Sequence, residues 1–481
     1  MDNRPEWGKG CSRGCLLPQR VVVAIMSFLA IICAYTHRVS ISHVITKLVV
    51  PINRTNDDVD KEDVCPVDED TSTETPLNKG DYDWSEQMQG YILGSFYLGY
   101  LISQLPGGVL ADKYGAKWVL SACLLLSGLC TMCLPLAIHV GEEWGLIVMR
   151  VFTGLAQGPL FPGLTALLSS WVPSHERGRL CAFAFSGVTI GTVVSNLSSG
   201  LMLHYFHWSV TFVVFGLTGP VWFIIFFFLC TSRPDQHPCI KPEELSYLTE
   251  ALGERSQGKS PLPWKELLLS VPLLALVISQ IGHDWGYYVM ITCLPKYIAN
   301  VIRFSIRSNG FVTALPFLAM FVCTNLAGLL ADYIIKSGKM SITNERKLYT
   351  FISAFGPGAF TVLASYAGCN KILVIGLFTF AMFLMGFYYS GQKLTPMDMS
   401  PSYAGTLMAI CNGLGSLAGL ASPPVVGYLT PNATMNEWRV VFWLGFVIFI
   451  ISAIVFAIIG TAEVQPYDPA YTGEKKKRIN L

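Results

Sequence analysis

Long apolar stretches, separated by shorter polar segments, fill most of the chain. Twelve of them are long enough to cross a hydrocarbon core of ~30 Å as one helix each. They cover residues 21–46, 88–110, 115–137, 144–170, 180–202, 209–231, 268–298, 309–332, 349–368, 372–395, 404–428 and 438–460. The pattern predicts an all-α membrane protein with twelve transmembrane helices.

Two polar segments are much longer than the others and indicate how the chain is divided. Residues 51–87 follow the first apolar stretch, and residues 232–267 separate six stretches from six. We expect an N-terminal segment (1–20), a first six-helix half (21–231), a linker (232–267), a second six-helix half (268–460) and a tail (461–481). Within the linker, Glu243 to Leu252 predicts a short amphipathic helix.

The charges in these segments predict the orientation of the chain. Pro51 to Gly90 carries twelve Asp or Glu against three Lys or Arg, whereas Lys and Arg gather in the loops on the opposite side. Because cytoplasmic loops are rich in Lys and Arg, we expect both termini and the linker in the cytoplasm. The sequons that begin at Asn53 and Asn432 then fall on the outer side, where they are candidate glycosylation sites.

Composition supports a membrane protein and argues against other classes. The chain is 52% hydrophobic and 14% charged, compared with about a quarter charged in soluble domains. The net charge is +1, and no basic patch with interleaved aromatic residues indicates a nucleic-acid partner. We find no catalytic constellation, nucleotide-binding loop or cluster of metal ligands in the sequence. We therefore expect no enzymatic activity, no cofactor and no metal site.

One motif occurs in both halves. GGVLADKYGAK (Gly107 to Lys117) follows the second apolar stretch, and AGLLADYIIKSGK (Ala327 to Lys339) follows the eighth. In this motif Gly108 and Gly115 allow helices to approach closely, and Asp112 and Asp332 can accept hydrogen bonds from helix N-termini or pair with a lysine, which gives them structural or gating roles. The repeat indicates two halves of common ancestry, and it resembles the motif of the major facilitator fold.

Four longer blocks extend the resemblance over nearly the whole chain. They are YDWSEQMQGYILGSFYLGY (82–100), FPGLTALLSSWVPSHERGRL (161–180), PWKELLLSVPLLALV (263–277) and MDMSPSYAGTLMAICNGLGSLAG (397–419). In sequence and order they resemble the anion and phosphate cotransporter family, which includes sialin, the vesicular glutamate transporters and the sodium-phosphate cotransporters of animals.

The resemblance implies secondary active transport of a small anion by alternating access. The substrate would be inorganic phosphate or an organic carboxylate, and transport would be coupled to sodium or protons. Three alternatives stay open: a lysosomal or vesicular transporter of sialic acid or glutamate-like anions, a passive anion channel, and a receptor or scaffold without transport.

Two arginines within apolar stretches are candidates for anion binding. A charge such as Arg38 costs roughly 2.5–3.5 kcal/mol at the centre of a membrane helix, and its planar guanidinium suits a carboxylate or a phosphate. The family has a similar arginine there and another at Arg150, whose helix face also carries Thr153 and Gln157. The alternatives are that both arginines extend to the membrane surface and that Gln157 only bonds a neighbouring helix.

The site of ion coupling is expected outside the fourth helix. Sialin and its close relatives carry acidic residues, associated with proton coupling, where this chain has Thr153 and Gln157. Asp284, near the middle of the seventh helix, is the remaining central acid and could carry a proton or meet a sodium ion; the alternative is that it only neutralises a nearby cation. His37 is a second coupling candidate, although it faces about 100° away from its neighbour on the first helix.

The seventh helix also supplies candidate substrate contacts. In QIGHDWGYYVM (280–290), His283 stands where the vesicular glutamate transporters have an arginine, and we expect it to line the cavity with Tyr288. Lys393, Asp398 and Asn412 are expected nearer the cytoplasmic ends of their helices, where a gating or structural role fits better than substrate contact.

The location of the protein is a further prediction. Leu16-Leu17 lacks the acidic residue four positions earlier that lysosomal dileucine signals usually carry, because Ser12 stands there. This favours the plasma membrane over lysosomal or vesicular membranes. The expected partners are the lipid bilayer and a small anionic substrate, and we expect a monomer.

Overall fold

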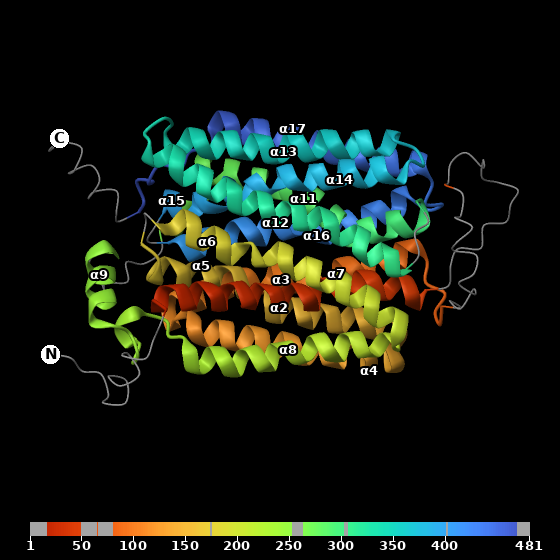
Figure 1. Ribbon diagram of the computed structural model, residues 1–481, viewed down its shortest axis with the longest axis horizontal. Helices are drawn as coiled ribbons and strands as arrows, with labels where there is room; N and C mark the ends of the chain where they lie inside the picture. Colours follow the sequence, from red (N-terminus) through yellow and green to blue (C-terminus); the bar gives the residue numbers. More distant parts are fainter. Residues whose placement is uncertain are drawn as a thin grey trace, which may run out of the picture.

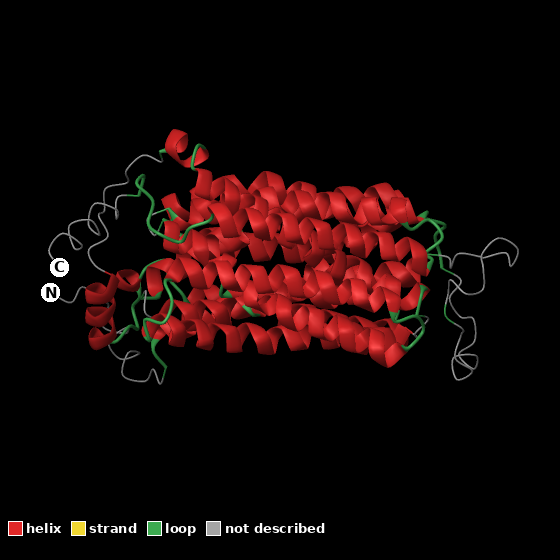
Figure 2. Cartoon of the chain, turned by 90° about the horizontal axis from the view of Figure 1, so that it is seen from above, coloured by secondary structure: helices red, strands yellow, loops and turns green. Residues whose placement is uncertain are grey.

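The computed structural model describes residues 17–49, 65, 80–173, 176–252, 263–302, 306–400 and 403–468. These residues form one bundle of long helices that run along a common axis (Figure 1), and the described part of the chain contains no strand (Figure 2). Helix α9 (Pro242–Leu252) lies beyond one end of the bundle, which we call the linker end. The opposite end is called the disulfide end, because the Cys65–Cys369 bond lies there.

The helices follow one another as two similar series. The first series is α2 (Gln19–Leu48), α3 (Glu86–Tyr114), α4 (Ala116–Gln157), α5 (Leu160–Trp171), α6 (Arg177–Phe185), α7 (Gly187–Tyr205) and α8 (Trp208–Leu229). The linker forms η4 (Pro234–Gln236), α9 and α10 (Trp264–Leu268). The second series is α11 (Val271–Asn300), α12 (Ile306–Lys336), α13 (Ile342–Tyr366), α14 (Lys371–Met385), η5 (Gly386–Tyr389), η6 (Gln392–Leu394), α15 (Thr395–Met399), α16 (Ala404–Leu429) and α17 (Met435–Ile459).

These helices make twelve crossings of the bundle. In the described residues, nine helical runs are long and apolar enough to span a membrane. One of them, Ala116–Trp171, crosses twice, because the chain reverses at Glu142 (φ 46°) and brings Gly145 against Ala137. Helices α3 and α11, with 29 and 30 residues, are also long enough to span a membrane, but they are more polar than these nine runs. The predicted fold class, an all-α protein with twelve membrane helices, is confirmed.

The tenth crossing differs from the continuous helix predicted over residues 372–395. Helix α14 gives way to the 3₁₀ turns η5 and η6 before α15 begins. At Gly386 the chain approaches α12 so closely that a Cβ would lie 2.9 Å from the carbonyl oxygen of Met320, and only glycine fits. Broken helices at membrane depth are typical of backbone that lines a cavity or site.

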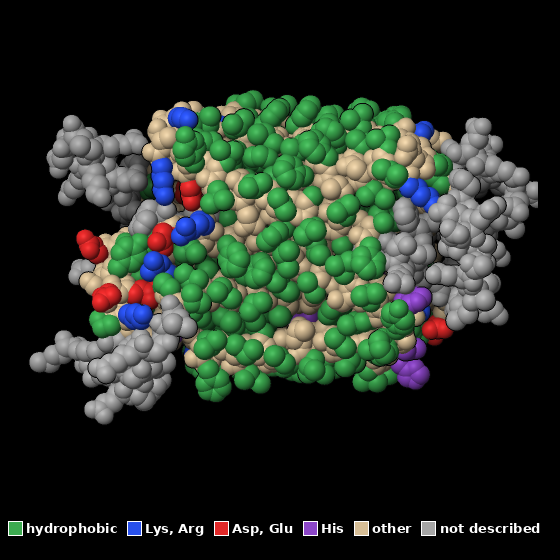
Figure 3. All heavy atoms as spheres, viewed as in Figure 1, with side chains coloured by type: hydrophobic (Ala, Val, Ile, Leu, Met, Phe, Trp, Pro, Cys, Tyr) green, Lys and Arg blue, Asp and Glu red, His purple; other side chains and the backbone are tan. Residues whose placement is uncertain are grey.

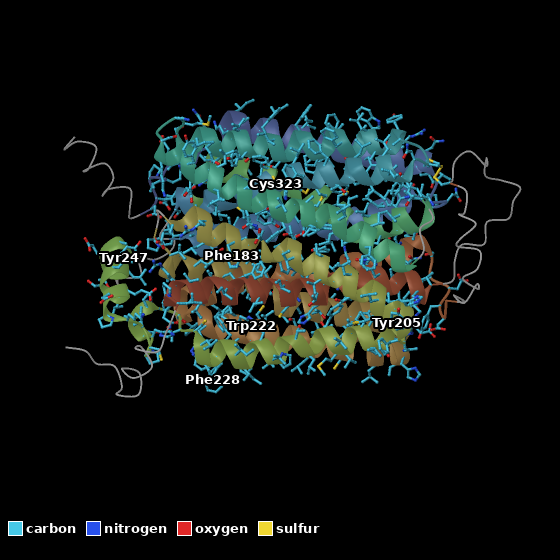
Figure 4. All side chains as sticks on the ribbon, viewed as in Figure 1. Phe183, Tyr205, Trp222, Phe228, Tyr247 and Cys323 are labelled. Carbon is cyan, nitrogen blue, oxygen red and sulfur yellow. A yellow bond between two sulfur atoms is a disulfide. The ribbon has the colours of Figure 1, made fainter. Side chains whose placement is uncertain are left out.

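The outer surface matches a lipid environment. Apolar side chains cover the flank of the bundle, and charged side chains gather at its two ends (Figure 3). Phe228 on α8 is 79% exposed and Ile372 on α14 is 85% exposed, and Figure 4 shows Phe228 pointing outward. On the inner face of α8, Trp222 instead donates to the carbonyl oxygen of Met26 and fastens α8 to α2.

Helices α3 and α16 come from different halves and pack closely along their length. Near the disulfide end, a Cβ added to Gly90 would lie 2.9 Å from the carbonyl oxygen of Pro423. Near the linker end, a Cβ added to Gly108 would lie 2.9 Å from the Cβ of Ala409. The absence of side chains at these glycines permits the close approach. The seam between the halves is therefore closed at both ends along this helix pair.

The repeated motif lies at the linker end. Gly115 has φ +95°, a conformation that favours glycine, and it separates α3 from α4. The carboxylate of Asp332, on α12, lies close to the backbone N–H of Arg179 near the start of α6. This contact joins the two halves, whereas the side chain of Asp112 lies outside the described residues.

Charged residues fasten several elements at the linker end. Glu244 of α9 accepts hydrogen bonds from the backbone N–H groups of Gln19 and Arg20 at the start of α2. Arg20 also pairs with Glu176 at 2.9 Å. The linker therefore contains the predicted short helix, and this helix is docked on the first half.

A second charged cluster at the linker end belongs to the other half. Arg346 of α13 pairs with Glu345 on the same helix at 2.6 Å and with Asp398 of α15 at 3.0 Å. Asp398 thus lies near the end of its helix, as expected.

At the disulfide end, Cys65 and Cys369 connect the two halves covalently. Cys65 belongs to the segment between α2 and α3, and its backbone N–H donates to the carbonyl oxygen of Val301 beyond α11. No pattern in the sequence indicates this pairing, because the partners are 304 residues apart. The C-x-x-C pair Cys130 and Cys133, which lies inside the third apolar stretch, contains free thiols.

Candidate functional site

Arg38 of α2 points into the bundle rather than to a membrane surface. The residue is 3% exposed, and none of its three guanidinium nitrogens has a hydrogen-bond partner among the described residues. Aromatic rings surround it: the guanidinium carbon lies 4.5, 4.6, 4.9 and 5.8 Å from the ring centroids of Phe96, Tyr100, Tyr35 and Tyr97. Cation–π contacts of this kind stabilise the charge without using its N–H donors.

Arg150 lies beside Arg38. It is 1% exposed, its Nη1 donates to the backbone oxygen of Arg38 at 3.4 Å, and its guanidinium carbon lies 5.0 Å from the Phe96 ring centroid. Its Nε has no partner among the described residues. Two buried cations therefore share one aromatic ring, and several of their donors are unused.

Gln157, the third candidate from the first half, lies close to the same stretch of α2. Its Nε2 donates to the carbonyl oxygen of Ala34 at 3.2 Å, while its Oε1 has no partner within the described part of the chain. The neighbouring Thr153 instead bonds the backbone of its own helix. Gln157 thus joins two helices and still presents an unpaired acceptor.

The second half contributes a polar group centred on Gln280. Gln280 donates to the Asp284 carboxylate at 2.9 Å and accepts from the Tyr388 hydroxyl at 2.8 Å. His283 stacks on the Tyr388 ring with 3.5 Å between centroids. The Nδ1 atom of His283 has no partner among the described residues.

The two groups meet in the centre of the bundle. The rings of Tyr97 and Tyr288 lie 4.4 Å apart, centroid to centroid, and Tyr97 is one of the rings around Arg38. Asp284 is 6% exposed, and its carboxylate lies directly against Gly415 of α16, one turn from Gly419, which lies against the Tyr97 ring. The structure therefore brings together all the predicted substrate contacts and Asp284.

His37 is the predicted site residue that lies apart from this group. Its ring nitrogens contact the Ser127 hydroxyl at 3.2 Å and the Phe215 carbonyl oxygen at 2.9 Å, on α4 and α8. Thr218 lies 3.2 Å from the same Nε2. Because His37 directly precedes Arg38 on the helix, its side chain points to another face of α2. Its position indicates helix packing within the first half.

Lys393 is a buried cation that is not among the substrate contacts predicted from the sequence. It is 5% exposed, its Nζ donates to Asn412 at 2.7 Å, and Nζ lies 4.7 Å from the ring centroid of Phe161. Both side chains therefore face the bundle interior, and their expected place nearer the cytoplasmic ends of their helices stays a prediction. A lysine in an apolar stretch was the available signal, because such residues usually face the bundle interior.

Of the two glycosylation candidates, the structure describes Asn432, which lies at the disulfide end. Asn432 is exposed in the turn between α16 and α17, where its Nδ2 donates to Glu437 at 3.3 Å. Thr434 of the same sequon caps α17 through its hydroxyl. Asn53 lies outside the described residues, so use of both sequons stays a prediction.

Comparison with known proteins agrees with this architecture. The sequence profile of the Major Facilitator Superfamily matches residues 23–423. A Drosophila melanogaster protein named "Putative inorganic phosphate cotransporter" is 35% identical over 470 residues, which cover 96% of this chain and 88% of that protein. Sialin of Homo sapiens is 34% identical over 448 residues, with 93% and 90% covered. The crystal structure of a D-xylose-proton symporter is similar in fold, with a TM-score of 0.64 at 12% identity, covering 93% of this chain and 99% of that one.

The fold and the matched profile define a multi-pass membrane protein of a transporter class. The chain belongs to the Major Facilitator Superfamily and, within it, to the family that holds sialin and the inorganic phosphate cotransporter relatives. The family resemblance of the four sequence blocks is thereby confirmed.

Proposed function

We propose that this protein is a secondary active transporter of a small oxyanion, inorganic phosphate or an organic carboxylate. The main evidence for this proposal is that the Arg38 guanidinium is buried and that none of its three nitrogens has a hydrogen-bond partner among the described residues. A buried charge without a partner is costly, and an arginine fork binds a carboxylate or phosphate through two parallel hydrogen bonds. An anion bound at Arg38 would satisfy these donors.

The groups around Arg38 also favour an anion over a cation. Arg150 adds a second positive charge, and its Nε is a further unused donor. The hydroxyl group of Tyr97 is buried and has no partner in the described residues, so it can donate as well. The names of the two relatives, an inorganic phosphate cotransporter and sialin, agree with anion transport.

Alternating access fits the arrangement better than a passive channel. Arg38 and Arg150 come from the first half, while His283, Asp284 and Tyr288 come from the second, so a bound anion would contact both halves. The α3–α16 seam is closed near both ends, at Gly90 and at Gly108. Rocking of the halves would open the site to one side at a time.

Asp284 is our candidate for ion coupling. It is a buried carboxylate that lies against Gly415, between the α16 residues that contact Tyr97 and Lys393, and its neutralisation by a proton or a sodium ion would change the balance of charge around the anion. We expect no further cofactor and no enzymatic activity.

The Cys65–Cys369 bond supports an orientation with the disulfide end outside. Disulfides persist in oxidising surroundings such as the cell exterior. The linker, both termini and the basic loops would then face the cytoplasm, in agreement with the distribution of charge. We place a monomer in the plasma membrane, with Asn53 and Asn432 glycosylated, in preference to a lysosomal or vesicular membrane.

Uptake into proteoliposomes tests the proposal. The purified full chain would be reconstituted and offered labelled phosphate, glutamate or sialic acid under imposed sodium and proton gradients. We expect saturable accumulation of at least one anion that requires one of the gradients. Accumulation of none of them would contradict the proposal, and gradient-independent flux that does not saturate would instead indicate a channel.

A further inference from the structure

Lys393 is a buried cation that the Arg38–Arg150 site leaves unexplained. The ammonium group has three N–H donors, and one of them bonds Asn412 at 2.7 Å. Within the described part of the chain, no carboxylate lies within ion-pair distance of Nζ. The lysine belongs to η6, the 3₁₀ turn in the break between α14 and α15.

Two unused polar side chains lie on the helices around Lys393. Thr165 of α5 is fully buried, and its hydroxyl has no partner among the described residues. It lies one turn from Phe161, whose ring is beneath the lysine, and therefore shares its helix face. Gln104 of α3 is also fully buried, and neither atom of its amide has a described partner. Its Cβ and Cγ atoms face Gly413, the neighbour of Asn412 in α16.

Helix α16 shows how this group is placed relative to Arg38. Gly419 lies against the Tyr97 ring, which belongs to the surroundings of Arg38. Asn412, the partner of Lys393, lies seven residues earlier on the same helix, which corresponds to ~10 Å toward the linker end. Gly415, between them, lies directly against the Asp284 carboxylate. The order along the bundle is therefore Arg38, Asp284, Lys393.

We propose that Lys393, Asn412, Thr165 and Gln104 form a second anion station on the linker side of Asp284. This inference rests on the proposed function: the same small oxyanion would occupy the Arg38 site first and the Lys393 station next, on its way to the linker end. A lysine binds an anion as a point charge without the bidentate geometry of arginine, which suits a station from which the anion is released.

The order of charges gives Asp284 a position between the two stations. An anion that moves from Arg38 to Lys393 must pass this carboxylate, and like charges repel. Binding of the coupling ion to Asp284 removes the repulsion, so passage is favoured when the ion is present. The arrangement thus links anion movement to the coupling ion through three residues at successive depths.

Side-specific transport tests the second station. Full-length protein with an affinity tag after Leu481 would be reconstituted, and vesicles with the tag outside would be separated from those with the tag inside. The half-saturating concentration of the anion that the wild type transports would then be measured from each end. For Lys393→Gln we expect it to rise about tenfold or more when the anion is offered at the linker end, and less than about twofold at the disulfide end.

Further variants distinguish an anion station from a lysine that only supports helix packing. Lys393→Arg keeps the charge, so its half-saturating anion concentrations should remain close to those of the wild type. Thr165→Val should raise the half-saturating concentration roughly threefold when the anion is offered at the linker end only. Lys339→Gln removes an exposed charge between α12 and α13 and serves as the control. If Lys393→Gln fails to fold, Thr165→Val becomes the test. A one-sided change in that variant supports the second station, and no change from either end contradicts it.

Two results would overturn the second station. An equal change from both ends would assign Lys393 to the Arg38 site, and no change from either end would make the lysine a structural partner of Asn412. A wild-type protein that transports no anion would contradict the proposed function itself, which is a different outcome from either of these.

Discussion

Replacement of Arg38 by alanine should remove anion binding without unfolding the protein. In the structure the guanidinium makes cation–π contacts with four rings at 4.5–5.8 Å and no hydrogen bond among the described residues. Its removal loses those contacts, but it also removes the cost of a buried charge without a counter-ion. These terms oppose each other, so we expect the apparent melting temperature of the anion-free protein to change little.

The effect on anion binding should be much larger. A hydrogen bond to a charged group contributes about 1.5–3 kcal/mol, and a bidentate arginine contact contains two of them. Loss of both corresponds to about 3–6 kcal/mol, or roughly a 10²- to 10⁴-fold weaker affinity. In the wild type, an anion at one hundred times its dissociation constant would stabilise the protein by about 2.7 kcal/mol. The variant should lose this stabilisation.

Thermal unfolding in detergent measures both effects in one experiment. The anion that the wild type transports would be titrated into the wild type, Arg38→Ala and Arg38→Lys, with expression and gel-filtration profiles as the check on folding. Arg38→Lys keeps a charge but loses the fork, so its shift in melting temperature should be intermediate. A full anion-dependent shift in Arg38→Ala, or near-normal uptake by that variant, would refute the assignment of Arg38 to the binding site.

Three other predictions follow from the same structure. Arg150→Lys should raise the half-saturating anion concentration because the second fork is lost, and an unchanged value in uptake assays would argue against direct contact. Asp284→Asn should retain anion binding and exchange but lose gradient-driven accumulation; if it still concentrates the anion with unaltered dependence on sodium and pH, coupling resides elsewhere. A membrane-impermeant maleimide should label Cys65 and Cys369 in intact cells only after reduction, and labelling without reductant would contradict the bond.

Much of the architecture could be predicted from the sequence, because each membrane crossing must bury about twenty apolar residues in one stretch. The interior placement of Arg38, Arg150 and Asp284 was also predictable. Ionisable residues are costly in lipid, so a charge within an apolar stretch points to the bundle interior.

The remaining features depend on contacts between distant segments. The tenth crossing is interrupted at Gly386, where the chain packs closely against α12, and Lys393 lies in the 3₁₀ turn η6 that follows; a pattern of apolar residues does not reveal such a break. His37 lies beside Arg38 in sequence, yet its ring is bonded by Ser127 and the Phe215 backbone. The Cys65–Cys369 bond joins loops from opposite halves, and spacing alone does not identify such a pair.

The aromatic surroundings of Arg38 illustrate the same limit. Phe96 and Tyr100 lie in a block of α3 that indicated the family, and Tyr35 lies one turn before the arginine. Aromatic residues are common in membrane helices, where they mostly pack against neighbouring apolar side chains. Their approach to one guanidinium becomes visible when α2 and α3 are placed together.

A structure of the full-length protein with the anion that it accumulates, determined by electron cryomicroscopy, would show directly whether Arg38 binds the substrate. We predict density for that anion within ~3 Å of the Arg38 guanidinium nitrogens, a normal hydrogen-bond distance, with Arg150 on the same side. An occupied anion site elsewhere, with the Arg38 guanidinium still enclosed by its four rings and unbonded, would contradict this assignment.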